Sequence, residues 1–173
     1  MIQQAVEAIH GVIDAHIREA LSTMPGGSVV SGLTTVVSRN TITEADIGRA
    51  AVRVQVEQQD AVTEPETMEG LEELPEISIG VTCTIVRSKV PALKGATDDE
   101  LCRVVRQVAR AVGYSIRRGF RLGVLDAEGA QIRTPRSITY GEPEAGEDAD
   151  LTLMTLSLSV PVLDYWALSA GGV

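Results

Sequence analysis

The sequence is poor in the residues that build disulfide frameworks, metal sites and aromatic surfaces. Aromatic side chains make up 3% of its 173 residues, and it has two cysteines and two histidines. Cys83 and Cys102 stand far apart in different predicted elements, which fits neither a disulfide framework nor a CxxC metal clip. We expect both to be reduced core thiols. A hydrophobic fraction of 44% is enough for a single domain spanning 1–173 to fold without disulfides or structural metals.

Motifs for catalysis, cofactors and metals are also missing. His10 and His16 lie six positions apart on a predicted helix, about 9 Å along its axis, so they do not share a metal easily and we expect a structural role for both. Neither GxxxxGK[ST] nor GxGxxG occurs, and no neighbouring residues suggest a nucleophile. The sequence therefore predicts no enzyme, no metal and no cofactor, although distant residues that converge in the fold leave a small enzyme as an alternative.

Long apolar runs are missing as well. The N-terminus has no basic region ahead of an apolar core, and its apolar residues are separated by polar ones at every turn. We therefore expect neither a signal peptide nor a membrane span, and a cytoplasmic origin.

Charge is abundant but unevenly distributed. The net charge of −9 argues against a general nucleic-acid binder, because such proteins rely on Lys and Arg to release counterions from phosphates. Residues 57–76 contain eight acids and no base, and residues 142–150 contain five acids and no base, whereas six of the fifteen basic residues fall within 103–121. We expect the acidic runs to be loops over about 58–76 and 141–150. The first is longer than usual connections and is therefore either disordered or functional.

Hydrophobic periodicity predicts the secondary structure. A helical stripe over 2–24 ends at Met24-Pro25-Gly26-Gly27, since proline and glycine terminate helices. Thr97 and Glu100 fit a capping box that opens a second helix, which continues to about Arg118. Alternating apolar residues and β-branched runs predict extended segments at 28–37, 52–57, 77–85, 132–140 and 151–160, with 52–57 and 77–85 paired antiparallel.

This order of elements predicts an α+β fold, with a single antiparallel sheet, two main helices packed on one face of it, and a long acidic hairpin loop. The last strand is apolar on both sides, with Leu151 and Leu153 on one and Met154, Leu156 and Leu158 on the other. We therefore expect it to be central in the sheet or covered by a partner.

The second helix carries the most informative pattern. Five arginines fall within about 60° of one another on a helical wheel, opposite a valine stripe; they are Arg103, Arg106, Arg110, Arg117 and Arg121. A solvated charged face is one interpretation. The alternative is an interface, because arginine pairs with carboxylates in a bidentate way, and in a ring the arginines of one copy could meet the acidic loop of the next. DNA binding by this face alone is disfavoured by the −9 charge.

The pattern of elements resembles the tail terminator proteins of long-tailed bacteriophages. The likeness covers most of the chain: an N-terminal helix, a strand pair with a long loop, an amphipathic helix in mid-chain, and a closing strand whose sequence ends in the segment from Leu156 to Trp166. The family has no catalytic motif to match, and the acidic insertion at 57–76 departs from its pattern.

The resemblance implies a hexameric ring in the virion, assembled in the host cytoplasm, that caps the tail tube and faces the head-side connector. DNA would pass through its lumen without sequence-specific binding, and carboxylates there would repel phosphates. Tyr165 and Trp166 would then be either a partner contact or a core plug. Another head-tail joint, such as a neck or head-completion protein, and a small enzyme or regulator are the alternatives.

Overall fold

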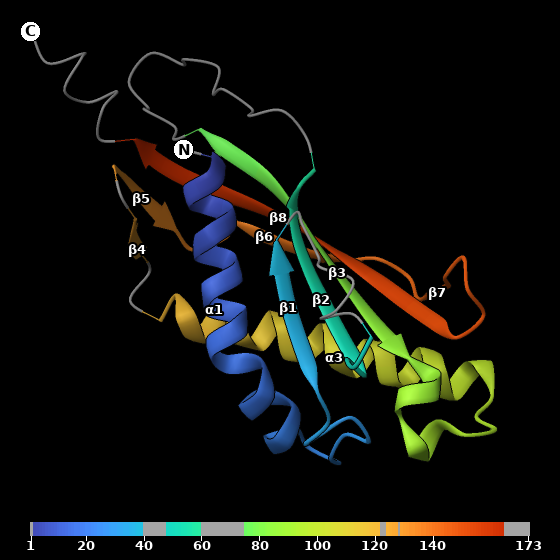
Figure 1. Ribbon diagram of the computed structural model, residues 1–173. Helices are drawn as coiled ribbons and strands as arrows, with labels where there is room; N and C mark the ends of the chain where they lie inside the picture. The colour runs from blue at the N-terminus through green and yellow to red at the C-terminus, as the bar shows by residue number, and fades with distance from the viewer. Residues whose placement is uncertain (1, 40–47, 60–74, 122–123, 128, 165–173) are drawn as a thin grey trace, which may run out of the picture.

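The computed structural model describes residues 2–39, 48–59, 75–121, 124–127 and 129–164. Within these residues the chain forms two long helices, eight strands and two short 3-10 helices, an α+β fold as predicted (Figure 1). The helices are α1 (Ile2–Thr23), η1 (Arg87–Lys89), η2 (Pro91–Leu93) and α3 (Asp98–Gly119). The strands are β1 (Thr35–Arg39), β2 (Val52–Gln58), β3 (Glu76–Val86), β4 (Val124–Ala127), β5 (Ala130–Arg133), β6 (Ser137–Tyr140), β7 (Glu144–Ala145) and β8 (Leu151–Asp164).

Strand β8 is the centre of the sheet, which has the order β1-β2-β3-β8-β5-β4. One edge of β8 pairs with β3 along the whole of that strand, from Glu76 opposite Pro161 to Val86 opposite Leu151. Its other edge pairs in turn with β7, β6 and β5. The expectation of a central last strand is therefore confirmed. Met154, Leu156 and Leu158 on one of its faces are buried, whereas Leu151 and Leu153 on the other face are half-buried.

The structure departs from the sequence-based expectation in four places. Pair β1–β2 is parallel, whereas the other strand pairs are antiparallel as predicted. Residues 28–33 form turns instead of a strand, in keeping with the positive φ of 76° at Gly32. The strand predicted at 132–140 is interrupted near Pro135, which has no amide N–H to pair. The second acidic loop, 141–150, contains β7.

The first acidic loop can be followed only at its ends. Glu57 and Gln58 belong to β2 and Glu76 begins β3, so the chain leaves and re-enters the sheet at the same end of these two paired strands. Residues 60–74, which make up most of the predicted loop, lie outside the described residues.

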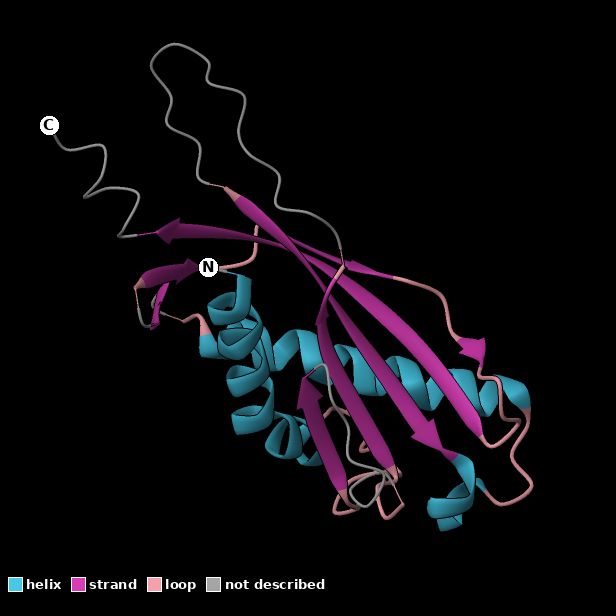
Figure 2. Ribbon diagram, turned by 45° about the horizontal axis from the view of Figure 1, so that its top comes forward, coloured by secondary structure: helices cyan, strands magenta, loops and turns pink. Residues whose placement is uncertain are grey.

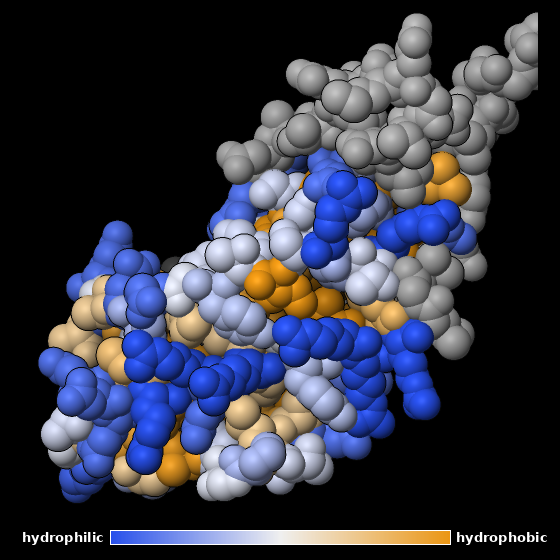
Figure 3. Space-filling model, turned by 180° about the vertical axis from the view of Figure 1, so that it is seen from behind, coloured by the Kyte–Doolittle hydropathy of each residue, from blue (hydrophilic) through white to orange (hydrophobic). Residues whose placement is uncertain are grey.

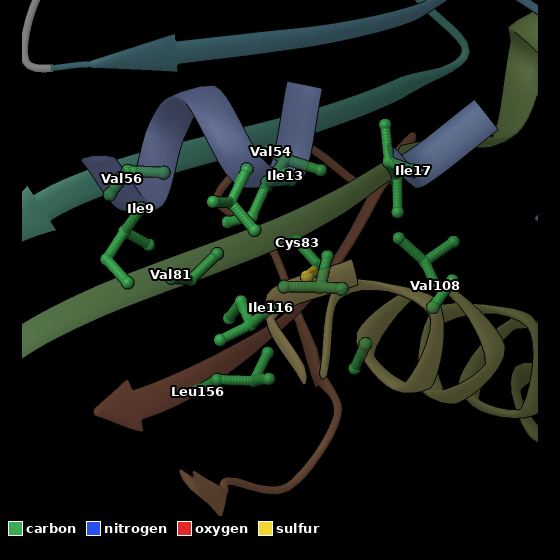
Figure 4. Packing of buried hydrophobic residues seen from close by; sticks show 14 of the residues in the cluster. Ile9, Ile13, Ile17, Val54, Val56, Val81, Cys83, Val108, Ile116 and Leu156 are labelled. Carbon is green, nitrogen blue, oxygen red and sulfur yellow. The ribbon is translucent and has the colours of Figure 1, made fainter. Parts of the chain in front are cut away.

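Both long helices cover the same face of the sheet (Figure 2). Alternate residues of β2, β3 and β8 point into the space between sheet and helices and are fully buried, for example Val54, Val81 and Leu156. They meet the apolar stripe of α1, which includes Ile9 and Ile13, and the corresponding stripe of α3 (Figure 4). Because these stripes occupy one side of each helix, the opposite side of α3 remains at the surface.

Helices α1 and α3 cross closely where α3 ends. A Cβ atom placed on Gly119 would lie 2.1 Å from Cγ1 and 2.6 Å from Cγ2 of Val12, so only glycine allows the approach. About two turns further along α1, Glu19 forms an ion pair with Arg118, with 3.0 Å between Oε1 and Nη1. The hydrogen bond that Arg118 donates to the Glu19 carboxylate raises the pKa of Arg118. These contacts fix the rotation of α3 about its axis and hence the direction of its exposed side.

Side chains of α1 also cap the outer edge of β1. His10 Nε2 lies 3.1 Å from the carbonyl oxygen of Val37, and Arg18 Nη2 donates to the carbonyl oxygen of Thr35 at 2.8 Å. These bonds occupy outward-facing acceptors of an edge strand, which would otherwise be free to pair with another chain. The structural role expected for His10 fits this contact.

Candidate interaction surface on helix α3

The predicted capping box begins α3. Thr97 Oγ1 accepts a hydrogen bond from the Glu100 amide at 3.3 Å, and the Glu100 carboxylate accepts one from the Thr97 amide at 2.9 Å. Asp98 and Asp99 add negative charge to the first turn, which interacts favourably with the helix dipole and stabilises the N-terminus of α3. With the helix fixed at this end, its buried residues, Val105 and Val108 among them, place the arginines on the opposite side.

The predicted arginines lie together on this exposed side. We call them the arginine row: Arg103, Arg106, Arg110, Arg117 and Arg121. All are exposed, and four lie on the helix, whereas Arg121 follows the capping residue Phe120. Seen from behind, hydrophilic side chains form a band across the molecule, with hydrophobic ones visible beside it (Figure 3). The other two predicted interface residues, Tyr165 and Trp166, lie outside the described residues.

Ion pairing within the arginine row is sparse. Arg106 lies 3.5 Å from Glu142, but the side chains are 50% and 90% exposed, so this pair contributes about 0–1 kcal/mol to stability. Arg103, Arg110, Arg117 and Arg121 form no ion pair with any residue that the structure describes. The row therefore presents guanidinium groups that can pair with the carboxylates of another molecule.

Two tyrosines extend this surface. Tyr114 lies between Arg110 and Arg117 in the sequence of α3 and is 50% exposed. Tyr140 comes from β6 and is 37% exposed, and its hydroxyl occupies the space beside Gly113, 2.0 Å from where a Cβ would be. Tyrosine and arginine are the residue types enriched at the energetic centres of protein interfaces.

Sequence reasoning could not place Tyr140 at this surface. Tyr114 belongs to α3 itself, whereas Tyr140 comes next to α3 only through the pairing of β6 with β8, which sets Tyr140 opposite Leu156. The available signal was Gly113, a glycine in the interior of a helix, which often marks a close approach by another element.

The outer edge of β6 lies beside the arginine row. The Gly141 amide donates to the Thr155 carbonyl of β8 at 2.8 Å. Because backbone groups alternate along a strand, Ile138 and Tyr140 direct their N–H and C=O groups away from β8. Among the described strands β6 pairs only with β8. The contacts of Tyr140 with Gly113 and of Glu142 with Arg106 show that this edge follows α3 in the opposite chain direction.

The described residues contain no group of three or more His, Cys, Asp or Glu side chains that could hold a metal ion. None of the described helices has the length and apolar character needed to span a membrane. The chemistry that the arrangement offers is recognition of carboxylates by arginine and of extended backbone by a strand edge.

Comparison with known proteins identifies no family. No protein-family model and no curated protein matches the chain. One of the solved structures that match it aligns with 92% of this chain and 96% of its own, at 15% sequence identity and a TM-score of 0.42. A likeness at that level does not bear on function.

Proposed function

We propose that this protein is a structural subunit of a bacteriophage virion, of the tail terminator kind, and that copies of it assemble through the arginine row. The observation that carries the proposal is that four of the five arginines in the row are exposed without an ion pair in the described subunit. The chain carries 24 acids against 15 bases, so a neighbouring copy is a ready source of carboxylates.

A contact of this kind builds a ring when its rotation closes. The arginine row and the acidic run of 57–76 are different parts of one chain, so their contact between copies is heterologous and continues from subunit to subunit until rotation closes it. The pairing is charge-assisted and partly exposed, which makes it sensitive to salt.

In this proposal the ring is hexameric, caps the tail tube and presents its other side to the head-side connector. DNA passes through the lumen without sequence-specific binding, and carboxylates that line the lumen of this acidic protein, with its net charge of −9 per subunit, would repel the phosphates. Tyr165 and Trp166 would contribute to a partner contact at the end of the chain. The protein would act by assembly alone, without a catalytic step.

Charge reversal tests the proposal. The double variant R106E/R110E places like charges opposite the acidic surface, and we expect it to remain a folded monomer by circular dichroism and light scattering. The matched control is K89E/K94E, which changes net charge equally at exposed positions of η1 and its surroundings and should assemble as the natural chain does. If R106E/R110E assembled with the same dependence on protein concentration as the natural chain, the arginine interface would be refuted.

A further inference from the structure

Strands β1 and β6 differ in how their outer edges are protected. On β1, α1 occupies two outward carbonyls through His10 and Arg18, and the Glu7–Arg39 ion pair of 2.7 Å adds a further link. On β6, the outward backbone groups of Ile138 and Tyr140 have no partner among the described residues. Natural proteins usually protect such edges, so an unprotected one beside a charged helix is a candidate for strand addition.

The surroundings of the β6 edge favour an acidic segment. A strand added to β6 would lie about 4.8 Å beyond it, on the side of α3 that carries Arg106. The ion pair with Glu142 places Arg106 along that side, and helical periodicity puts Arg110 and Arg117 on the same face of α3 as Arg106. Alternate side chains of the added strand would point toward these arginines, so carboxylates there could form bidentate pairs. Tyr140 would supply the apolar contact.

We propose that the β6 edge and the adjoining part of the arginine row bind the acidic segment 60–74 of a second copy as an added strand. This segment carries six acids and no base; they are Asp60, Glu64, Glu66, Glu69, Glu72 and Glu73. Its 15 residues reach at most about 25 Å from the sheet and back, enough to meet a neighbour. The inference rests on the proposed function in that it names the contact that joins one subunit to the next.

Glu142 competes for the same arginines. Its carboxylate lies 3.5 Å from Arg106 and in the path of an added strand. The pair is exposed and weak, so an incoming segment with several carboxylates displaces it. Substitution E142Q therefore increases the affinity for the acidic segment by up to about fivefold, the range of an exposed ion pair.

The test uses the full chain in two forms and a peptide of residues 60–74 as the probe. One form is natural, and the other carries D60N, E64Q, E66Q, E69Q, E72Q and E73Q. We expect the neutralised form to stay monomeric. When peptide is added at ten times its Kd, hydrogen exchange of the Ile138 and Tyr140 amides slows about tenfold, since about one site in ten stays empty. The Val37 amide on the capped β1 edge is the internal control, and its exchange rate should not change. In the neutralised form, the substitutions R106E/R110E weaken peptide binding at least about tenfold.

The outcomes separate this inference from the ring. If the natural chain assembles but Ile138 and Tyr140 exchange as fast as in the neutralised monomer, strand addition at β6 is wrong and the ring stands. If the natural chain stays monomeric at every salt concentration while the peptide protects both amides, the ring is wrong and the strand site stands. If a peptide with its six acids neutralised protected the Ile138 and Tyr140 amides equally well, the proposal that the bound segment is recognised by its acids would be wrong.

Discussion

Replacement of Gly119 by alanine tests the crossing that directs the arginine row outward. The new Cβ would lie 2.1 Å from Val12 Cγ1, 2.6 Å from Cγ2 and 2.9 Å from Cβ. Val12 is 8% exposed and β-branched on a helix, so its methyl groups have little freedom to move and the helices must separate. Overpacking of this kind costs about 1–3 kcal/mol, which exceeds the gain of up to about 1 kcal/mol that alanine brings over glycine in a helix.

Urea unfolding with G119A, V12A and the double variant measures this cost. V12A removes the two closest atoms and leaves the Cβ at 2.9 Å. We therefore expect G119A to cost much less in the V12A background, with a coupling energy of about 1–2 kcal/mol. The matched control is G11A on α1, where a Cβ meets nothing within 4 Å; it should stabilise the protein by about 0.5–1 kcal/mol. Equal stabilisation by G119A and G11A would refute the close crossing.

Three further predictions concern the helix cap, the acidic segment and Cys83. T97A removes the hydroxyl of the capping box and should lower the free energy of unfolding by about 1 kcal/mol in a urea titration; an unchanged midpoint would contradict the cap. Deletion of 60–74 should leave the circular dichroism spectrum and cooperative unfolding intact, and loss of the folded domain would mean that this segment is part of the sheet. Burial raises the pKa of Cys83 from 9.0 to about 12. Above pH 9 the unfolded chain therefore loses a proton that the folded chain keeps, and the free energy of unfolding falls as the pH rises from 9 to 12. This fall with pH should be shallower in C83A, and an equal fall in both proteins would refute the raised pKa of Cys83.

The elements with strong periodicity were predictable, and those set by long-range pairing were not. The stripes of α1 and α3, and the alternation in β2 and β3, follow from local sequence, and their bounds agree with the prediction within a few residues. The parallel direction of β1 could not be predicted, because it depends on where residues 40–51 carry the chain. Strands β5, β6 and β7 are short, and they exist because β8 provides a long edge for them.

The candidate surface divides in the same way. A helical wheel was sufficient to bring Arg103, Arg106, Arg110 and Arg117 to one side of α3, since the valine stripe fixes the buried side. The free edge of β6 required the register of β6 on β8, which no local pattern carries. The free edge adds backbone groups that can pair with another strand to the charged side of α3.

The solution mass of the purified protein, measured by light scattering at low and high salt, tests self-assembly through charged surfaces most directly. We predict a closed ring near six times the 18.4 kDa of one chain at low salt, and its dissociation at high salt, where exposed ion pairs are screened. A mass of one chain at both salt concentrations, unchanged when tail-tube protein is added, would contradict the account.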